Sequence, residues 1–125
     1  MDCNPIDVLE EILMDVPDLV FVYAEDGRYL FVNTAGGEFL GADPFEVIGY
    51  HWQDLGYPAE VMEPFTQTLA KVFESGRPMF YEIVSTPERG SRHLDISLTP
   101  LKCDDGIIAG VLAICRDVTR FSSCL

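Results

Sequence analysis

Two histidines, His51 and His93, are the side chains of this chain best suited to bind a metal or to transfer a proton near neutral pH. They lie too far apart in the sequence to form a local metal motif. His51 precedes Trp52 in a short turn and could ligate haem or a metal, but we interpret it as a structural residue. His93 alternates with Asp95 and Ser97 on the polar side of an expected strand, where a solvated or interface histidine is ordinary. No metal site is therefore predicted.

The nucleophilic residues show no catalytic arrangement. Cys3, Cys103, Cys115 and Cys124 are widely scattered without a CxxC spacing, so neither a zinc site nor a disulfide framework is indicated, and reduced thiols are expected. A GxSxG motif is absent, and no cysteine has a histidine beside it. The Gly36-Gly37 pair lacks the surrounding motif of a phosphate-binding loop. We expect a chain without catalytic activity.

Composition and charge exclude several classes of partner. The chain has 125 residues, of which 48% are hydrophobic, enough for one domain with one core. Its formal charge of −13 repels phosphate backbones and anionic membranes, so nucleic-acid binding is not expected. The apolar runs are too short to span a bilayer, and the acidic N-terminus is unlike a secretory signal, so no membrane contact and a cytoplasmic location are expected.

The first half of the chain predicts a helix, a hairpin and several short helices. Asn4-Pro5 is a typical helix start, and the helix over 5–15 carries one apolar stripe. The Asp26-Gly27 turn joins strands at 19–23 and 28–32. Short helical pieces are then expected at 35–40, 44–47 and 50–56.

The second half predicts a longer helix followed by three strands. The helix ends at Glu74, and Pro64 is expected to split it into a turn near 58–62 and a helix from about 64. The strands are expected at 78–86, 91–101 and 107–117. Because the last strand is apolar on both sides, it belongs in the middle of a sheet that is covered on both faces. The fold class is therefore α+β, with a five-stranded antiparallel sheet and helices on one face.

Several motifs together resemble a PAS domain. They are the Glu25-Asp26-Gly27-Arg28 turn, the Phe31-Val32-Asn33-Thr34-Ala35 junction, Glu46-Val47-Ile48-Gly49, Glu74-Ser75-Gly76-Arg77-Pro78 and Arg116-Asp117-Val118-Thr119. The resemblance covers 17–120, and it implies a sheet of order 2-1-5-4-3 and a sensory role in a bacterial or archaeal signalling protein such as a histidine kinase. It also implies that a signal leaves through Asp117 and Thr119. We interpret 1–16 as an N-terminal amphipathic helix and 121–125 as the start of a linker to an output domain in the same chain.

The resemblance does not extend to the cofactor-bearing branches of the family. The sequence lacks the Gly-Arg-Asn-Cys-Arg-Phe-Leu-Gln signature of flavin-binding light sensors, and no cysteine lies between Cys3 and Cys103. The haem-binding branch needs an axial histidine, usually on the long helix, and 61–74 contains none. Neither haem nor flavin is expected, and an unidentified small organic ligand stays open.

A set of large apolar residues could line a ligand cavity between the long helix and the sheet. Plain core packing accounts for the same residues, and both interpretations stay open. The candidates are Phe31, Phe39, Leu40, Trp52, Leu55, Phe65, Leu69, Phe73, Tyr81, Ile96 and Leu98.

The second sheet face also needs a cover, for which the N-terminal helix is the natural candidate. The residues of its stripe proposed for this role are Leu9, Ile12, Leu13 and Val16. The helix could fold back onto its own sheet or exchange with a second subunit, and a homodimer is expected. The sequence thus supports a sensory module with a small ligand or, alternatively, a ligand-free dimerisation module.

Overall fold

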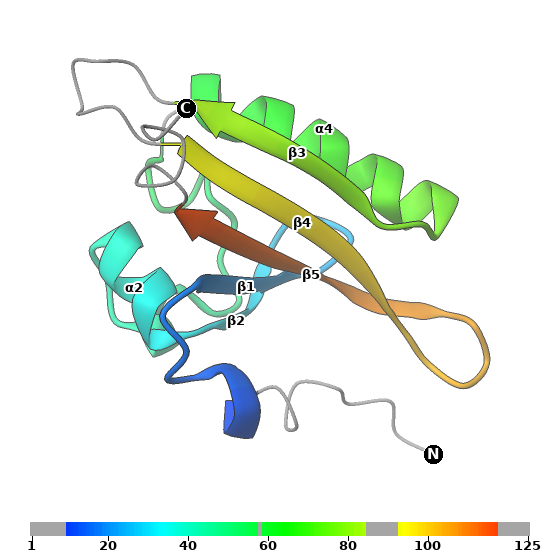
Figure 1. The fold of residues 1–125 in the computed structure, drawn as a ribbon, viewed down its shortest axis with the longest axis horizontal. Coiled ribbons are helices and arrows are strands. Elements are labelled where there is room, and N and C mark those ends of the chain that lie inside the picture. Colours follow the sequence, from blue (N-terminus) through cyan, green and yellow to red (C-terminus); the bar gives the residue numbers. More distant parts are fainter. Residues whose placement is uncertain (1–9, 58, 85–92, 118–125) are drawn as a thin grey trace, which may run out of the picture.

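The computed structural model describes residues 10–57, 59–84 and 93–117 (Figure 1). After a short helical segment at 10–13 come two strands, then three helices, then three strands, in the order expected from the sequence. The bounds are β1 (Leu19–Tyr23), β2 (Tyr29–Val32), α2 (Thr34–Leu40), α3 (Pro44–Val47), α4 (Ala59–Ser75), β3 (Met79–Val84), β4 (His93–Lys102) and β5 (Ile108–Asp117).

The five strands form one antiparallel sheet in the order β2-β1-β5-β4-β3, which confirms the predicted fold. The final strand, β5, lies at the centre between β1 and β4 (Figure 1). Its Ala113 pairs with Phe21 on one side and with Leu98 on the other. This position explains why β5 is apolar on both faces, since a central strand has neighbours above and below as well as beside it.

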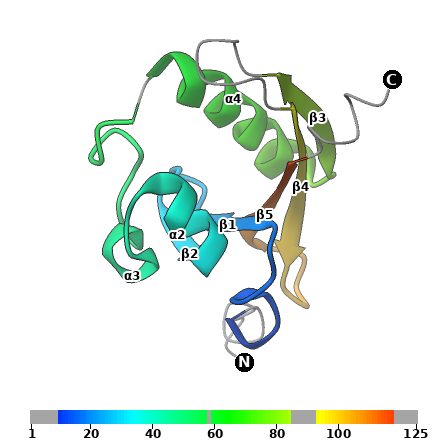
Figure 2. The same cartoon turned by 60° about the vertical axis from the view of Figure 1, so that its left-hand side comes forward.

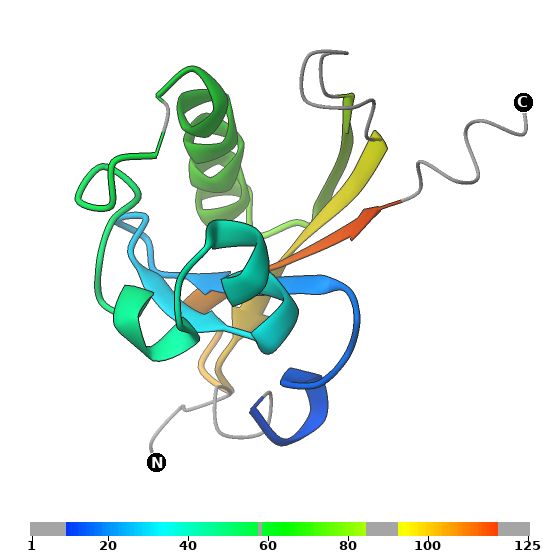
Figure 3. The ribbon, with the colours of Figure 1, turned by 90° about the vertical axis from the view of Figure 1, so that its left-hand side faces the viewer.

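Helices α2, α3 and α4 lie on one face of the sheet, here named the inner face (Figures 2 and 3). The main hydrophobic cluster lies between these helices and the sheet, and Trp52, Leu69, Val72, Leu98 and Val111 are among its buried members. Each such large side chain stabilises the fold by about 1.5–3 kcal/mol through its removal from water. The inner face is thus the main core of the domain.

The opposite or outer face is covered in part by the N-terminal segment. Residues 10–13 are helical, and Leu13 and Val16 pack in a second cluster around buried Val20, Val22 and Phe31. For this part of the chain the structure shows a segment that folds back onto its own sheet. Leu9 and the first half of the helix expected at 5–15 lie outside the described residues.

Asn33 fastens this segment to the sheet, and it is fully buried. Its Nδ2 atom donates to the carbonyls of Leu13, Val16 and Asp18 at 3.1, 3.3 and 2.9 Å. Its Oδ1 atom accepts from the backbone N–H groups of Val20 and Gly36 at 3.1 and 2.8 Å, the second as the N-cap of α2. One side chain therefore joins the N-terminal segment, β1 and α2.

The predicted break at Pro64 is wrong, because α4 runs without interruption from Ala59 to Ser75 with Pro64 inside it. Pro64 is the sixth residue of the helix, so the hydrogen bond that it cannot make would go to the carbonyl of Glu60 in the first turn. Glu60 is exposed, and water can satisfy its carbonyl. The loss is small at this position, and the apolar face of α4 keeps the helix whole.

The cysteines differ from the expectation of reduced thiols at one position. Cys103, just after β4, is disulfide-bonded, and its partner lies outside the described residues. Cys115 is a free, buried thiol on β5. The scattered spacing gave no sign of a bridge, because cysteines far apart in the sequence are brought together only by the fold.

Candidate functional site

The inner face gathers most of the residues predicted to line a ligand cavity. Nine of the eleven belong to the main hydrophobic cluster, and the structure thus places them between the helices and the sheet. They are Leu40, Trp52, Leu55, Phe65, Leu69, Phe73, Tyr81, Ile96 and Leu98. Their contact with a ligand stays a prediction.

Phe31 and Phe39 lie elsewhere. Phe39 is 54% exposed on α2. Phe31 is buried in the cluster of the outer face, because the pairing of β1 with β2 shifts between Val22 and Tyr23. One residue of β2, Leu30, is left without a partner there, and an extra residue in a strand reverses which later side chains face the core. Phe31 therefore points away from the cavity expected on the inner face.

Tyrosine hydroxyls are among the polar groups buried in this largely apolar region. The Tyr81 hydroxyl is buried with no hydrogen-bond partner among the described residues. The Tyr29 hydroxyl is buried near the Tyr23 hydroxyl, which interacts with it but not in good hydrogen-bond geometry. The Tyr29 ring lies against the Tyr23 ring with centroids 4.9 Å apart, and Tyr23 lies 5.0 Å from Phe65 of α4. A buried hydroxyl without a partner costs about 1–3 kcal/mol, so a group that accepts its hydrogen bond would be stabilised there.

Burial controls the ionisation of these groups. It raises the pKa of Tyr29 to about 12, and it raises the pKa values of Tyr23 and Tyr81 as well. Burial likewise raises the pKa of the Cys115 thiol to about 12. All four groups are thus neutral at physiological pH, and the inner face offers weak donors rather than charges.

Trp52 connects the loop after α3 to the long helix. Its Nε1 atom donates to the Thr66 hydroxyl at 3.0 Å, and that hydroxyl donates to the carbonyl of Met62 at 2.8 Å. The helical piece expected at 50–56 is a series of hydrogen-bonded turns instead, in which three successive N–H groups donate to the carbonyls of His51, Trp52 and Gln53. The indole therefore forms a fixed wall beside α4.

His51 has a structural position. Its Nδ1 atom accepts from the backbone N–H of Gln53 at 3.1 Å, and its ring lies beside the tilted Trp52 ring with centroids 5.2 Å apart. Its other side faces Gly27, where an added Cβ would lie 2.9 Å from Nε2. The ring thus packs between the first hairpin turn and the loop.

The predicted signal exit is described only in part. Asp117 is the last residue of β5, and its backbone pairs with Leu94 of β4. Thr119 lies outside the described residues. The role of both residues in signalling stays a prediction.

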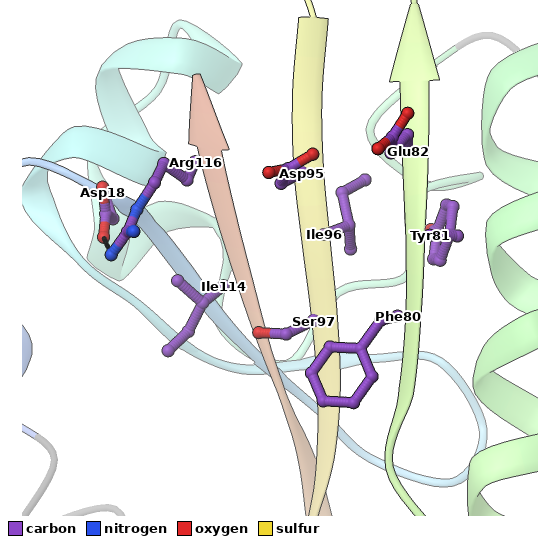
Figure 4. A pocket seen from close by; sticks show the side chains of 9 residues that line it. All are labelled: Asp18, Phe80, Tyr81, Glu82, Asp95, Ile96, Ser97, Ile114 and Arg116. Carbon is purple, nitrogen blue, oxygen red and sulfur yellow. Dashed lines mark hydrogen bonds and ion pairs between the residues drawn. The ribbon is translucent and has the colours of Figure 1, made fainter. Parts of the chain in front are cut away.

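The outer face carries an open hollow of about 560 Å³ over β3, β4 and β5 (Figure 4). Phe80 is 74% exposed beside it, and Arg116 pairs with Asp18 at 3.4 Å across its far side. The residues that line it are Asp18, Phe80, Tyr81, Glu82, Asp95, Ile96, Ser97, Ile114 and Arg116. This surface could not be predicted from the sequence, because it depends on the register of three strands.

The sheet order and the helices on its inner face agree with the comparison to known families. The PAS fold family model matches residues 13–123, which is most of the chain. The chain belongs to the PAS family. Its members are sensory and signalling modules, so the predicted assignment is confirmed at the level of the family.

Solved structures of low identity share this PAS fold. The PAS domain of Bordetella pertussis BvgS is 19% identical with a TM-score of 0.75, and the match covers 96% of this chain and 98% of that one. The PAS domain of the histidine kinase ThkA is 22% identical with a TM-score of 0.64, covering 80% and 99%. A phage VqmA-DPO complex is 21% identical with a TM-score of 0.76, covering 94% of this chain and 55% of that one. The chain thus spans about half the length of the VqmA structures. No curated protein sequence matches.

Proposed function

We propose that this PAS module binds a small, largely apolar ligand on the inner face of its sheet and passes the signal to an output domain. The observation that carries the proposal is the pair of buried hydroxyls, Tyr29 and Tyr81, which lack well-formed hydrogen bonds in a cluster that is mostly apolar. Ligand sites of this type combine apolar walls with a few fixed polar groups. A ligand with one or two hydrogen-bond acceptors would satisfy both hydroxyls.

The structural neighbours support this class of function. VqmA has been solved bound to DPO, and ThkA is a histidine kinase. Among solved structures with this fold, therefore, one has a bound ligand and another comes from a histidine kinase. For this chain, both are part of the proposal, as is the absence of haem and flavin.

Native mass spectrometry of freshly purified protein tests the proposal, since it reports bound molecules and subunit number together. We expect a co-purified small molecule, or one recovered by screening metabolite extracts. Tyr29→Phe and Tyr81→Phe should each weaken binding by about tenfold while leaving stability equal or higher, because an unpaired hydroxyl is removed. Tyr50→Phe, which changes an exposed tyrosine, is the matched control.

A specific result would contradict the proposal. If both phenylalanine variants lose about 1–3 kcal/mol of stability and no small molecule binds the wild-type chain, the hydroxyls stabilise the folded core and bind no ligand. The inner face would then be a solid interior.

The proposed route of the signal is the central strand. β5 contacts the inner cluster through Val111, Ala113 and Cys115, and it ends at Asp117. A ligand that shifts these residues would move the end of β5 and bias the attached domain between two states. In the full-length protein, Asp117→Ala should uncouple ligand binding from output while ligand affinity stays unchanged. An output unaffected by Asp117→Ala would exclude this route.

Dimerisation without a ligand is the second candidate, and the exposed Phe80 beside the outer hollow favours it. Such a large exposed aromatic ring is typical of interface centres. Light scattering of the wild type should give twice the monomer mass, and Phe80→Ser should reduce the measured mass to that of the monomer. Ile12→Ala and Leu13→Ala are compared in the same assay. Ile12 is 62% exposed, so its replacement affects only an interface, whereas Leu13 packs on the sheet and its replacement also weakens the fold.

A cytoplasmic location is also part of the proposal. None of the described helices has the length and apolar character needed to cross a membrane. The disulfide at Cys103 favours an oxidising compartment instead, because such bonds are rare in the reducing cytoplasm. Thiol labelling in intact and lysed cells distinguishes the two, since a cytoplasmic Cys103 would be reduced and would react after lysis.

A further inference from the structure

Three potential metal ligands converge on the outer face at the β3–β4 pair. Glu82 of β3 lies directly opposite Asp95 of β4, and His93 precedes Asp95 by two residues on the same side of that strand. The Nε2 atom of His93 lies 3.1 Å from Oε2 of Glu82 and 3.8 Å from Oδ1 of Asp95. One ligand atom from each residue lies within 4.8 Å of the other two.

These separations suit a single small cation. Zinc binds imidazole nitrogen and carboxylate oxygen at about 2.0–2.2 Å, and tetrahedral angles then place the ligand atoms roughly 3.3–3.6 Å apart. The two observed nitrogen-to-oxygen distances, 3.1 and 3.8 Å, fall on either side of that separation. Small side-chain rotations would therefore complete three coordination positions, and water would fill the fourth.

The charges favour a cation as well. Two carboxylates directly opposite each other on neighbouring strands repel, and Figure 4 shows those of Glu82 and Asp95 side by side above the strands. Arg116, the cation that lines the same hollow, pairs with Asp18 at 3.4 Å. The net charge of −13 adds a field that attracts cations to the whole surface.

We propose that Glu82, His93 and Asp95 form a binding site for a divalent transition-metal ion, with zinc as its best representative. One imidazole with two carboxylates is a donor set that suits zinc better than calcium or magnesium, which prefer oxygen alone. The site lies on the face opposite the proposed ligand cavity and does not depend on it. The site is not evident from the sequence, because Glu82 and His93 meet only through the register of β3 with β4.

Calorimetric titration of the purified chain tests the site. The protein is treated with a chelator, dialysed, and titrated with zinc chloride, and we expect one ion per chain. His93→Gln should weaken zinc binding at least about tenfold, since loss of a ligand costs no less than loss of an outer partner. Glu82→Gln and Asp95→Asn should each weaken it as well. His51→Gln and Glu74→Gln are the controls, because they remove the other histidine and an equal charge elsewhere.

Thermal unfolding gives a readout that does not depend on calorimetry. Zinc should raise the melting temperature of the wild type and of both controls, and it should leave that of His93→Gln unchanged. Without metal, Glu82→Gln should melt no lower than the wild type, because the repulsion between the carboxylates is relieved. Magnesium at the same concentration should give no shift.

Three results would overturn the proposal. The first is zinc affinity that is equal in His93→Gln and the wild type. The second is zinc binding that disappears on alkylation of the cysteines and persists in all three ligand variants. The third is the absence of binding at millimolar zinc, which would mean that the histidine and the two carboxylates interact without binding a metal.

Discussion

Replacement of Asn33 by alanine should be among the most damaging single changes in this domain. The Oδ1 atom satisfies two buried backbone donors, at Val20 and Gly36. Each buried N–H left without a partner costs about 1–3 kcal/mol, so the acceptor alone accounts for roughly 2–6 kcal/mol. Domains of this size are stable by about 5–15 kcal/mol, and Asn33→Ala thus removes a large fraction of the total.

Urea denaturation followed by circular dichroism measures this loss. The midpoint should fall while the slope with urea stays the same, since the folded and unfolded surfaces barely change. Glu38→Ala, an exposed position on the same helix, is the control and should shift stability by less than about 0.5 kcal/mol. A loss below about 1 kcal/mol for Asn33→Ala would refute the reasoning, because it would mean that both donors find other partners.

Asn33→Asp separates the two halves of the side chain. The carboxylate still accepts from Val20 and Gly36, but it cannot donate to the carbonyls of Leu13, Val16 and Asp18. Hydrogen exchange should then increase in residues 13–18 and remain slow in α2. Equal loss of protection in both regions would show that the side chain acts as one unit.

Three further predictions follow from glycine geometry and from buried ionisable groups. Gly27→Ala should destabilise the fold by more than about 1 kcal/mol, because Gly27 has φ +90° and an added Cβ would meet His51. Thermal melts of Gly27→Ala with and without His51→Ala separate the backbone strain from the contact with the histidine. Burial raises the pKa of Cys115 to about 12, so this thiol should resist iodoacetamide at pH 8 until urea unfolds the chain. Mass spectrometry detects the labelling, and rapid labelling of the folded protein would contradict the prediction. Burial raises the pKa of Tyr29 above its unfolded value near 10 to about 12, so the stability that it contributes is complete below pH 10 and is lost as pH rises towards 12. Urea titrations at several pH values should show this decline in the wild type and a smaller one in Tyr29→Phe. An equal decline in both proteins would exclude Tyr29 as its source.

The central place of β5 was predictable from the apolar pattern of that one segment, whereas the full strand order was predicted from the resemblance to PAS domains. A long strand that is apolar on both sides has to be central, and Asp26-Gly27 fixes the first hairpin. The error at Pro64 has a different origin. Local sequence cannot show that the carbonyl opposite the proline belongs to an exposed first turn, or that tertiary packing holds α4 together.

The candidate site was predictable only where neighbouring segments alternate regularly. Strict alternation along β2 would place Tyr29 and Phe31 on the same face, yet the extra residue at Leu30 separates them. Tyr29 then faces Tyr23 in the main core, while Phe31 faces Val22 beneath the N-terminal segment. A shift of one residue in pairing cannot be read from apolar composition, because both faces of this sheet are apolar.

The β3–β4 pair shows how one register can produce two separate surfaces. Tyr81 pairs with Ile96 and both belong to the inner cluster, whereas the next pair, Glu82 with Asp95, points outward. The proposed ligand cavity and the proposed metal site therefore lie back to back on adjacent residue pairs of the same two strands. If these two strands have two arrangements, binding at either site changes the affinity of the other site by the same factor. Zinc titrations with and without the inner ligand would measure that factor, and a value of one would mean that the strand pair is rigid.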